Sequence, residues 1–330
     1  MEIFCVNSVK GGSGKTTVSL AILYNRALNC RTAAKAEGIK EEEQLRFAYV
    51  DLDLQGTGVS RLIYEDKDRD RITFYNNQKN QRESVKDFYY KDFRNLFPEY
   101  DQPSVVIDAY LLNDSDDAKT FYNINDKELL ESRNINRFKG RAMRLMDQIL
   151  KSGEYDTVVF DCAPSYDYIA SDFFEHVCRN YGGHENRIVN AFVTTLEKSH
   201  VYTTISKVSN ILRKSEYNLG IHVICNDITG YLDVPDRRNQ TEEETIKLKF
   251  EKEKKRKEII EKVYNEIIRE KTGSEMKESP LDFPRDRVII LDKLNISDTF
   301  VFSENITLNQ RNILELLGNG RLVEDLKLEM

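Results

Sequence analysis

Residues 3–17 read IFCVNSVKGGSGKTT, and this stretch decides the fold. An apolar, strand-like run leads into a glycine-rich segment, and a helical pattern begins at Lys15. Gly11, Gly12 and Gly14 let the backbone turn tightly, so that successive N–H groups point toward one ligand. The N-terminus of the following helix adds the positive end of its dipole. The stretch therefore predicts a strand–loop–helix unit that binds phosphate groups.

The side chains of this loop suit a nucleotide and a divalent cation. Lys15 provides a mobile positive charge for β- and γ-phosphates, and the Thr16 hydroxyl is a suitable ligand for Mg²⁺. We expect nucleotide contacts from the whole segment: Lys10, Gly11, Gly12, Ser13, Gly14, Lys15, Thr16 and Thr17.

The loop departs from the strict pattern GxxxxGK[ST], because Val9 stands where that pattern has glycine. It reads KGGSGKTT from Lys10 instead, and so resembles the deviant Walker A loop of the ParA/MinD family, closest to ParA/Soj-like proteins. The resemblance implies an ATPase that uses ATP and Mg²⁺ and forms an ATP-dependent homodimer. It also implies that Lys10 reaches across the dimer to the partner's nucleotide.

Carboxylates are expected near such a loop to hold Mg²⁺ and to orient water. Residues 48–56 read AYVDLDLQG and resemble the family segment vDxDxQG, with Leu54 in place of the usual proline. By that resemblance Asp53 positions the attacking water and is catalytic together with Lys10 and Lys15. Asp51 lies near the metal through water.

A second carboxylate ends an apolar run in residues 155–165, YDTVVFDCAPS. This segment resembles the Walker B strand of the family, so Asp161 is expected to hold Mg²⁺ through a water molecule. The predicted metal-site residues are thus Thr16, Asp51, Asp53 and Asp161.

A third segment, residues 220–227 (GIHVICND), resembles a later family strand whose terminal asparagine contacts adenine. Asn226 matches that asparagine. An ordinary turn asparagine explains the same residue equally well, and the sequence leaves both interpretations open.

Strand-like apolar runs alternate with helical patterns along the chain, which predicts a doubly wound, mostly parallel α/β sheet with helices on both faces. The resemblance to the ParA/MinD family implies a P-loop NTPase fold of the SIMIBI type. The expected strands are residues 3–7, 47–52, 104–108, 156–161, 188–194, 220–226 and 287–291. The expected helices are residues 15–30, 137–151, 168–179, 200–214, 242–271 and 308–317. We expect one domain over residues 1–330, with insertions near 31–46 and 64–103 and a charged helical segment at 242–271.

Composition narrows the classes of protein. The 330 residues are 40% hydrophobic and 32% charged, with a net charge of −7, which does not favour nucleic acid or an acidic membrane as a global partner. No apolar run is long enough to predict a membrane span, and the N-terminus lacks a basic leader, so we expect a cytoplasmic protein. The cysteines form no CxxC pair and are interpreted as reduced core thiols, without an iron–sulfur cluster; they are Cys5, Cys30, Cys162, Cys178 and Cys225.

Three biological roles remain open at this level. A ParA-like partition or positioning role requires DNA binding and a stimulating protein partner. Its candidate surface runs from Lys247 to Lys257 and holds seven basic and two acidic residues, although a solvated helix with i,i+4 ion pairs explains that stretch slightly better. An ATP-gated adaptor acts on a protein partner in a mobile-element or defence system, and the aromatic-rich 64–103 region is a candidate surface for it. A MinD-like membrane-cycling role is disfavoured, because residues 318–330 are short and acidic.

Overall fold

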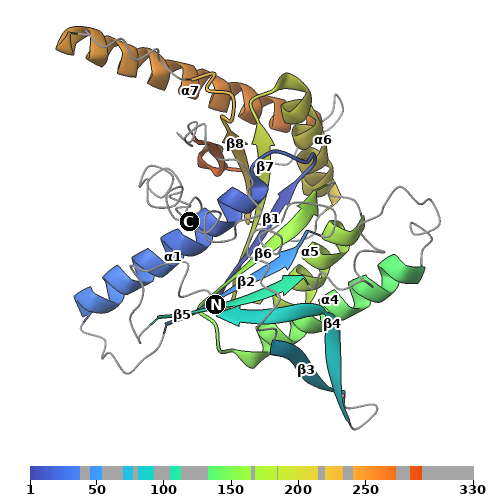
Figure 1. Ribbon diagram of the computed structural model, residues 1–330. Coiled ribbons are helices and arrows are strands. Elements are labelled where there is room, and N and C mark those ends of the chain that lie inside the picture. The colour runs from blue at the N-terminus through green and yellow to red at the C-terminus, as the bar shows by residue number, and fades with distance from the viewer. Residues whose placement is uncertain are drawn as a thin grey trace, which may run out of the picture.

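The computed structural model describes residues 1–37, 45–53, 70–76, 81–92, 105–112, 133–164, 168–183, 185–214, 220–232, 241–272 and 283–291. Its centre is a nine-stranded sheet of order β3-β4-β5-β2-β6-β1-β7-β8-β9 (Figure 1). The strands are β1 (Glu2–Ser8), β2 (Leu45–Leu52), β3 (Asp70–Asn76), β4 (Gln81–Asp92), β5 (Val105–Leu112), β6 (Thr157–Pro164), β7 (Arg187–Thr195), β8 (Gly220–Asn226) and β9 (Val288–Leu291).

Seven neighbouring strands, from β5 to β9 in the sheet order, are parallel. Strands β3 and β4 extend one edge in antiparallel fashion. The predicted mostly parallel sheet is therefore confirmed, and all seven strands expected from the sequence are present.

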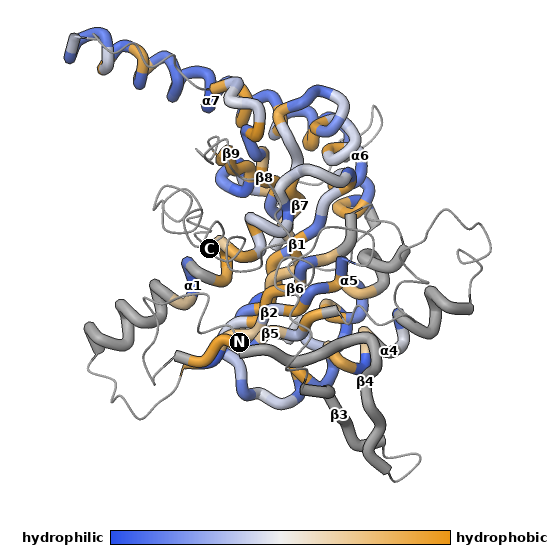
Figure 2. The backbone as a smooth tube through the Cα atoms, in the orientation of Figure 1, coloured by the Kyte–Doolittle hydropathy of each residue, from blue (hydrophilic) through white to orange (hydrophobic). Residues whose placement is uncertain are grey.

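Helices cover both faces of the sheet. They are α1 (Lys15–Glu37), α4 (Arg133–Ser152), α5 (Tyr168–Tyr181), α6 (Lys198–Lys214) and α7 (Glu242–Thr272). One apolar core joins the sheet to α1, and the other joins it to α4, α5, α6 and the later part of α7. The central parallel strands are largely apolar on both faces (Figure 2), because neither face of a covered parallel sheet meets water.

Alternate side chains of one strand serve the two cores. In β1, Ile3 and Cys5 join the core under α4 to α7, whereas Phe4 and Val6 join the core under α1. Such a strand needs an unbroken apolar run, which is why the sequence identified it. The run also fixes where β1 ends, and hence where the glycine loop begins.

The chain departs from the predicted elements in two places. Helix α1 continues to Glu37 and β2 begins at Leu45, so both ends of the expected insertion at 31–46 belong to regular elements. The expected insertion at 64–103 contributes β3 and β4, which the sequence did not predict. The helix expected at 308–317 lies outside the described residues.

Four cysteines are buried free thiols, as expected of core residues: Cys5, Cys162, Cys178 and Cys225. Burial raises the pKa of Cys162 and Cys225 to about 12, so both stay protonated at neutral pH. Among the described helices, none is both long enough and apolar enough to cross a membrane.

Candidate functional site

The glycine loop lies between β1 and α1, at the carboxyl end of the central strand. Gly12 and Gly14 have φ angles of 75° and 81°, a backbone region that residues with a Cβ rarely adopt. The carbonyl of Gly14 accepts the first helical hydrogen bond, from Val18 N at 3.0 Å. Thr16 and Thr17 are half-buried in the first turn of α1. The N–H groups of this turn have no carbonyl partner within the helix, so they face the loop.

Asn226, at the end of β8, supports the loop from a neighbouring part of the sheet. Its Nδ2 donates to the carbonyl oxygen of Ser13 at 3.0 Å. A Cβ placed on Gly14 would lie 2.3 Å from the same nitrogen, so glycine is required there by contact as well as by conformation. The structure thus places Asn226 against the phosphate loop, and contact with adenine stays a prediction.

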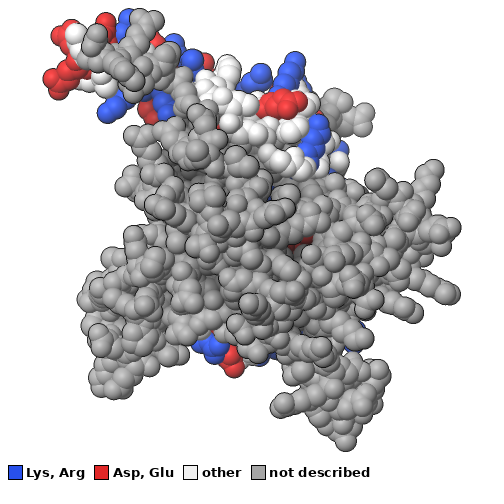
Figure 3. Space-filling model, viewed as in Figure 1, with Lys and Arg blue, Asp and Glu red and all other residues white. Residues whose placement is uncertain are grey.

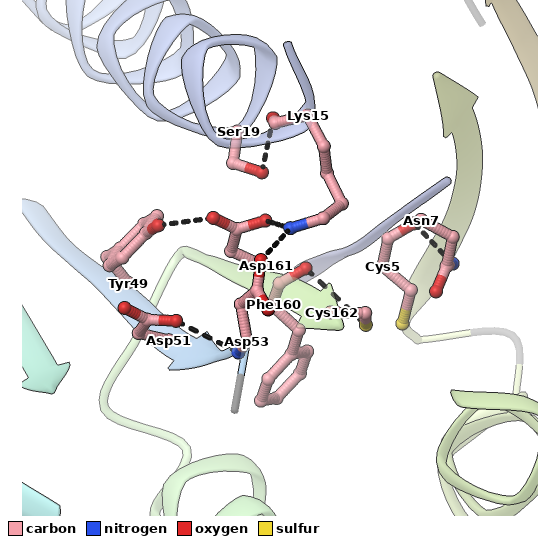
Figure 4. A network of polar contacts seen from close by, with 10 residues as sticks. All are labelled: Cys5, Asn7, Lys15, Ser19, Tyr49, Asp51, Asp53, Phe160, Asp161 and Cys162. Carbon is pink, nitrogen blue, oxygen red and sulfur yellow. Dashed lines mark hydrogen bonds and ion pairs between the residues drawn. The ribbon is translucent and has the colours of Figure 1, made fainter. Parts of the chain in front are cut away.

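Lys15 is the centre of a buried ion-pair network (Figure 4). Its Nζ lies 2.6 Å from Asp161 Oδ1 and 3.3 Å from Asp53 Oδ2. The side chains of Lys15, Asp53 and Asp161 are 5%, 7% and 0% exposed. Burial alone lowers the pKa of Lys15, but the Asp161 and Asp53 carboxylates outweigh it and raise the pKa, so the ammonium stays charged.

The sheet order explains why residues so distant in sequence meet. Strand β6 lies between β1 and β2, and its Asp161 is in register with Val6 of β1 and with Asp51 of β2. Asp53 follows β2 directly, and its backbone N–H donates to Asp51 Oδ1 at 3.0 Å. The predicted metal-site carboxylates therefore gather at the carboxyl ends of β2 and β6, beside the glycine loop. Strand β6 was expected to end at Asp161, but it continues to Pro164.

Lys10 differs from Lys15 in its surroundings. Its side chain is exposed, and Nζ lies 3.5 Å from Ser199 Oγ at the start of α6. The Ser199 hydroxyl in turn donates to Glu197 at 2.6 Å. This hydrogen bond, followed by the charges of His200 and Lys10, lowers the pKa of Glu197. Lys10 is thus outside the buried network and at the surface beside the loop.

The residues present fit Mg·ATP. Within the described chain, the buried hydroxyls of Ser8 and Ser13 have no hydrogen-bond partner, so the loop retains polar atoms that a phosphate satisfies. Three carboxylates and one ammonium leave the buried group formally negative, which suits a divalent cation. No described cluster of three or more Asp, Glu, His or Cys side chains could hold a metal by itself. Mg²⁺ needs no such cluster, because it commonly keeps water and phosphate ligands.

Sequence reasoning missed three residues of this region. Tyr49 is fully buried, and its hydroxyl donates to Asp161 Oδ2 at 2.8 Å. A tyrosine inside a buried apolar strand was a usable signal, because a buried hydroxyl requires a partner. Asn7 and Asn190 form a buried amide pair between β1 and β7, beneath the loop, and no motif marks them.

Comparisons with known proteins give structural likeness only. No family model matches the chain, and a search of curated proteins finds no significant match. A crystal structure of a ParA family ATPase from Chlorobium tepidum TLS is 13% identical, with a TM-score of 0.48, over 98% of this chain and 95% of that one. A protein from Borrelia burgdorferi B31 described as a plasmid partition protein, bound to AMPPNP, is 15% identical, with a TM-score of 0.41, over 96% of this chain and 97% of that one. The assignment of the site rests on its residues and geometry.

The loop geometry predicts different outcomes for two glycine substitutions. Gly14→Ala is expected to lower the free energy of unfolding by about 1–3 kcal/mol, because alanine is strained at positive φ and meets Asn226. Gly11→Ala is the matched control, since a Cβ there meets nothing within 4 Å. Urea denaturation of both variants measures the difference. Equal stability of the two would contradict the described loop conformation.

Proposed function

We propose that the chain is a Mg·ATP-dependent ATPase that works as a nucleotide-switched dimer in the cytoplasm. One observation carries the proposal: a lysine at the start of a helix, after a left-handed glycine loop, contacts two buried carboxylates from neighbouring strands. A solvent-exposed turn with incidental lysines would have neither the burial nor the paired carboxylates.

The proposed roles follow from position. The N–H groups of residues 11–17 bind phosphate oxygens, and Lys15 leaves its ion pairs to neutralise the β- and γ-phosphates. Thr16, Asp161 and Asp51 hold Mg²⁺, the last two through water. Bound Mg²⁺ supplies positive charge that neutralises the transferring phosphoryl group. Asp53, next to Lys15, orients the attacking water.

The switch is assigned to Lys10. Its exposed ammonium lies at the rim of the site, near Ser199, and is not engaged in the buried network. A second copy placed face to face would bring its own phosphates within reach of this lysine. ATP then stabilises the dimer and hydrolysis releases it, so the output of the reaction is a change of partner.

Among the biological roles, partition or positioning through DNA and a stimulating protein is the leading proposal. Lys254, Lys255 and Lys257 on α7 are exposed, whereas Val263 and Ile267 of the same helix are buried in the core. Arg256 does not join this surface, because its Nη2 donates to the carbonyl of Ile290 at 2.7 Å.

The ATP-gated adaptor is the second candidate. Ile246 and Phe250 on α7 are 62% and 71% exposed, and they interrupt the basic surface with apolar side chains. Apolar exposure favours a protein contact over a phosphate backbone. The aromatic region expected to serve the adaptor role, 64–103, includes β3 and β4.

Asp53→Ala is expected to bind Mg·ATP but to lose at least about 99% of its turnover, since the water loses its orienting group while the loop remains. Phosphate release measures turnover, and Asp286→Ala, an exposed aspartate on η3 (Arg285–Arg287), is the control.

In light scattering, Asp53→Ala should be a dimer in Mg·ATP and a monomer in Mg·ADP. The double variant Asp53→Ala with Lys10→Ala should be monomeric in both nucleotides. The control double variant, Asp53→Ala with Lys151→Ala, should still form the dimer in Mg·ATP.

Wild-type turnover in Asp53→Ala would remove the catalytic assignment. A mass that is the same in Mg·ATP and Mg·ADP would remove the switch and leave an ATP-binding protein.

DNA binding is tested with the same ATP-locked variant and a random-sequence duplex. Retention should fall steeply as salt rises, with a log–log slope of about −0.9 per phosphate contact. Lys254→Glu with Lys255→Glu should abolish retention while nucleotide binding persists. Absence of retention at low salt would exclude the DNA role and leave the adaptor as the account.

A further inference from the structure

Helix α7 is longer than the body that it packs against. Its later part is anchored by Val263 and Ile267, which are 2% and 0% exposed. Its earlier part extends beyond the other described helices and strands (Figure 1), and most side chains of residues 242–254 are exposed. Figure 3 shows both acidic and basic atoms along this projecting part. We call residues 242–257 the arm.

The arm has its own local stabilisation. Thr241 and Glu244 form a reciprocal capping box: the Thr241 hydroxyl accepts from Glu244 N–H at 3.3 Å, and Glu244 accepts from Thr241 N–H at 3.1 Å. The acidic first turn, which includes Glu242 and Glu243, is favourable at the positive end of the helix dipole. The first turn of the arm is thus stabilised by its own residues, whereas its last residues contact the body, where Arg256 donates to the carbonyl of Ile290.

One flank of α7 repeats the same pattern along the helix, in which aromatic or aliphatic side chains lie between charged ones. In the anchored part, this flank holds Glu261 and Tyr264 and contacts a later segment of the same chain. Tyr264 stacks on Phe283 with ring centroids 6.4 Å apart, and Arg285 forms an ion pair with Glu261. In the anchored part of α7, this mixed apolar and charged flank is therefore covered by residues of the same chain.

The same flank continues along the arm as residues spaced three or four apart, so that they share one face. They are Glu243, Ile246, Phe250, Glu253 and Lys257. All five are exposed, and Phe250, at the centre, is the most exposed of the large apolar residues in the described chain, at 71%. Glu253 also forms a local ion pair with Arg256 at 3.3 Å.

We propose that this flank binds the same flank of a second copy of the chain, with the two arms antiparallel and a two-fold axis at Phe250. In that register the two Phe250 rings meet, and Ile246 lies on the aliphatic stem of the partner's Lys254. Glu243 and Lys257 are equally distant from Phe250 on opposite sides, so each faces its opposite charge. Lys247 and Glu253 are matched in the same way. An isologous contact requires such self-complementarity.

The charge pattern favours a second copy over nucleic acid for this face. Glu243 and Glu253 lie on either side of the apolar centre, where they would repel a phosphate backbone. In the antiparallel register the same two carboxylates become attractive contacts. Of the lysines proposed for DNA, Lys255 lies about 140° around the helix from Phe250, whereas Lys254 lies at the side of the contact, where its stem meets the partner's Ile246.

The contact is small. It spans about four helical turns and falls below the roughly 1,200 Å² of a stable interface, so it is weak between single chains. The next step rests on the proposed function. A dimer held together by nucleotide carries two arms, and a contact at each arm links one dimer to another. The arm contact itself does not depend on nucleotide.

Charge exchange tests the register directly. In the Asp53→Ala background with Mg·ATP, sedimentation velocity should detect species larger than the dimer. Glu243→Lys alone and Lys257→Glu alone should each remove them, because both symmetric pairs become repulsive. An equimolar mixture of the two variants should restore them, because every pair then joins opposite charges. Larger species that persist in a single variant, or a mixture no larger than its components, would overturn the antiparallel contact.

Disulfide trapping separates this inference from the switch, because it needs no nucleotide. In a Cys30→Ser background, Phe250→Cys lies on the proposed axis and should form an intermolecular disulfide about tenfold faster than Lys249→Cys. Lys249 is exposed on the same arm but lies about 100° around the helix. Equal rates would exclude the arm contact even if nucleotide-dependent dimers form. Faster trapping at residue 250 supports it even if Asp53→Ala stays monomeric in Mg·ATP, a result that would remove the switch alone.

Discussion

The contact of Lys15 with Asp161 and Asp53 is the interaction on which the arrangement of the site depends. It joins three strands that are far apart in sequence, because the lysine follows β1 and the carboxylates belong to β6 and to the end of β2. Removing one member of a buried ion pair commonly costs about 3–5 kcal/mol, since the remaining charge has no compensation. The sheet order and the ion pairs therefore support each other, because the sheet brings the charges together and each charge then has an opposite partner.

The same network explains why the site suits both a metal and a phosphate. The buried group contains three carboxylates and one ammonium. A divalent cation and an anion are accommodated there more readily together than separately, because the positive charge that one adds is balanced by the negative charge of the other. In the proposed function, Lys15 exchanges these carboxylate partners for phosphate oxygens. Tyr49 stays on the far side of Asp161 and holds that carboxylate in place.

The sequence predicts the parallel sheet and the glycine loop between β1 and α1 because both depend on local pattern. A doubly covered strand must be apolar throughout, and a glycine loop at its end has few other uses. The sequence could not predict β3 and β4, because an antiparallel extension at the sheet edge requires no unbroken apolar run; β4 reads QRESVKDFYYKD. Similarly, the sequence left the role of Asn226 open between adenine contact and an ordinary turn. Its hydrogen bond to Ser13 depends on the order of β8, β7 and β1, which the spacing of residues along the chain does not contain.

The central claim is that this network binds Mg·ATP, and titration calorimetry of the full chain tests it most directly. We predict saturable binding of one ATP per chain in the presence of Mg²⁺, weaker binding in EDTA, and no binding to Lys15→Ala under conditions where circular dichroism finds that variant folded. Tight, Mg²⁺-independent ATP binding that Lys15→Ala retains, or no binding to the folded wild-type chain at millimolar ATP, would contradict the account.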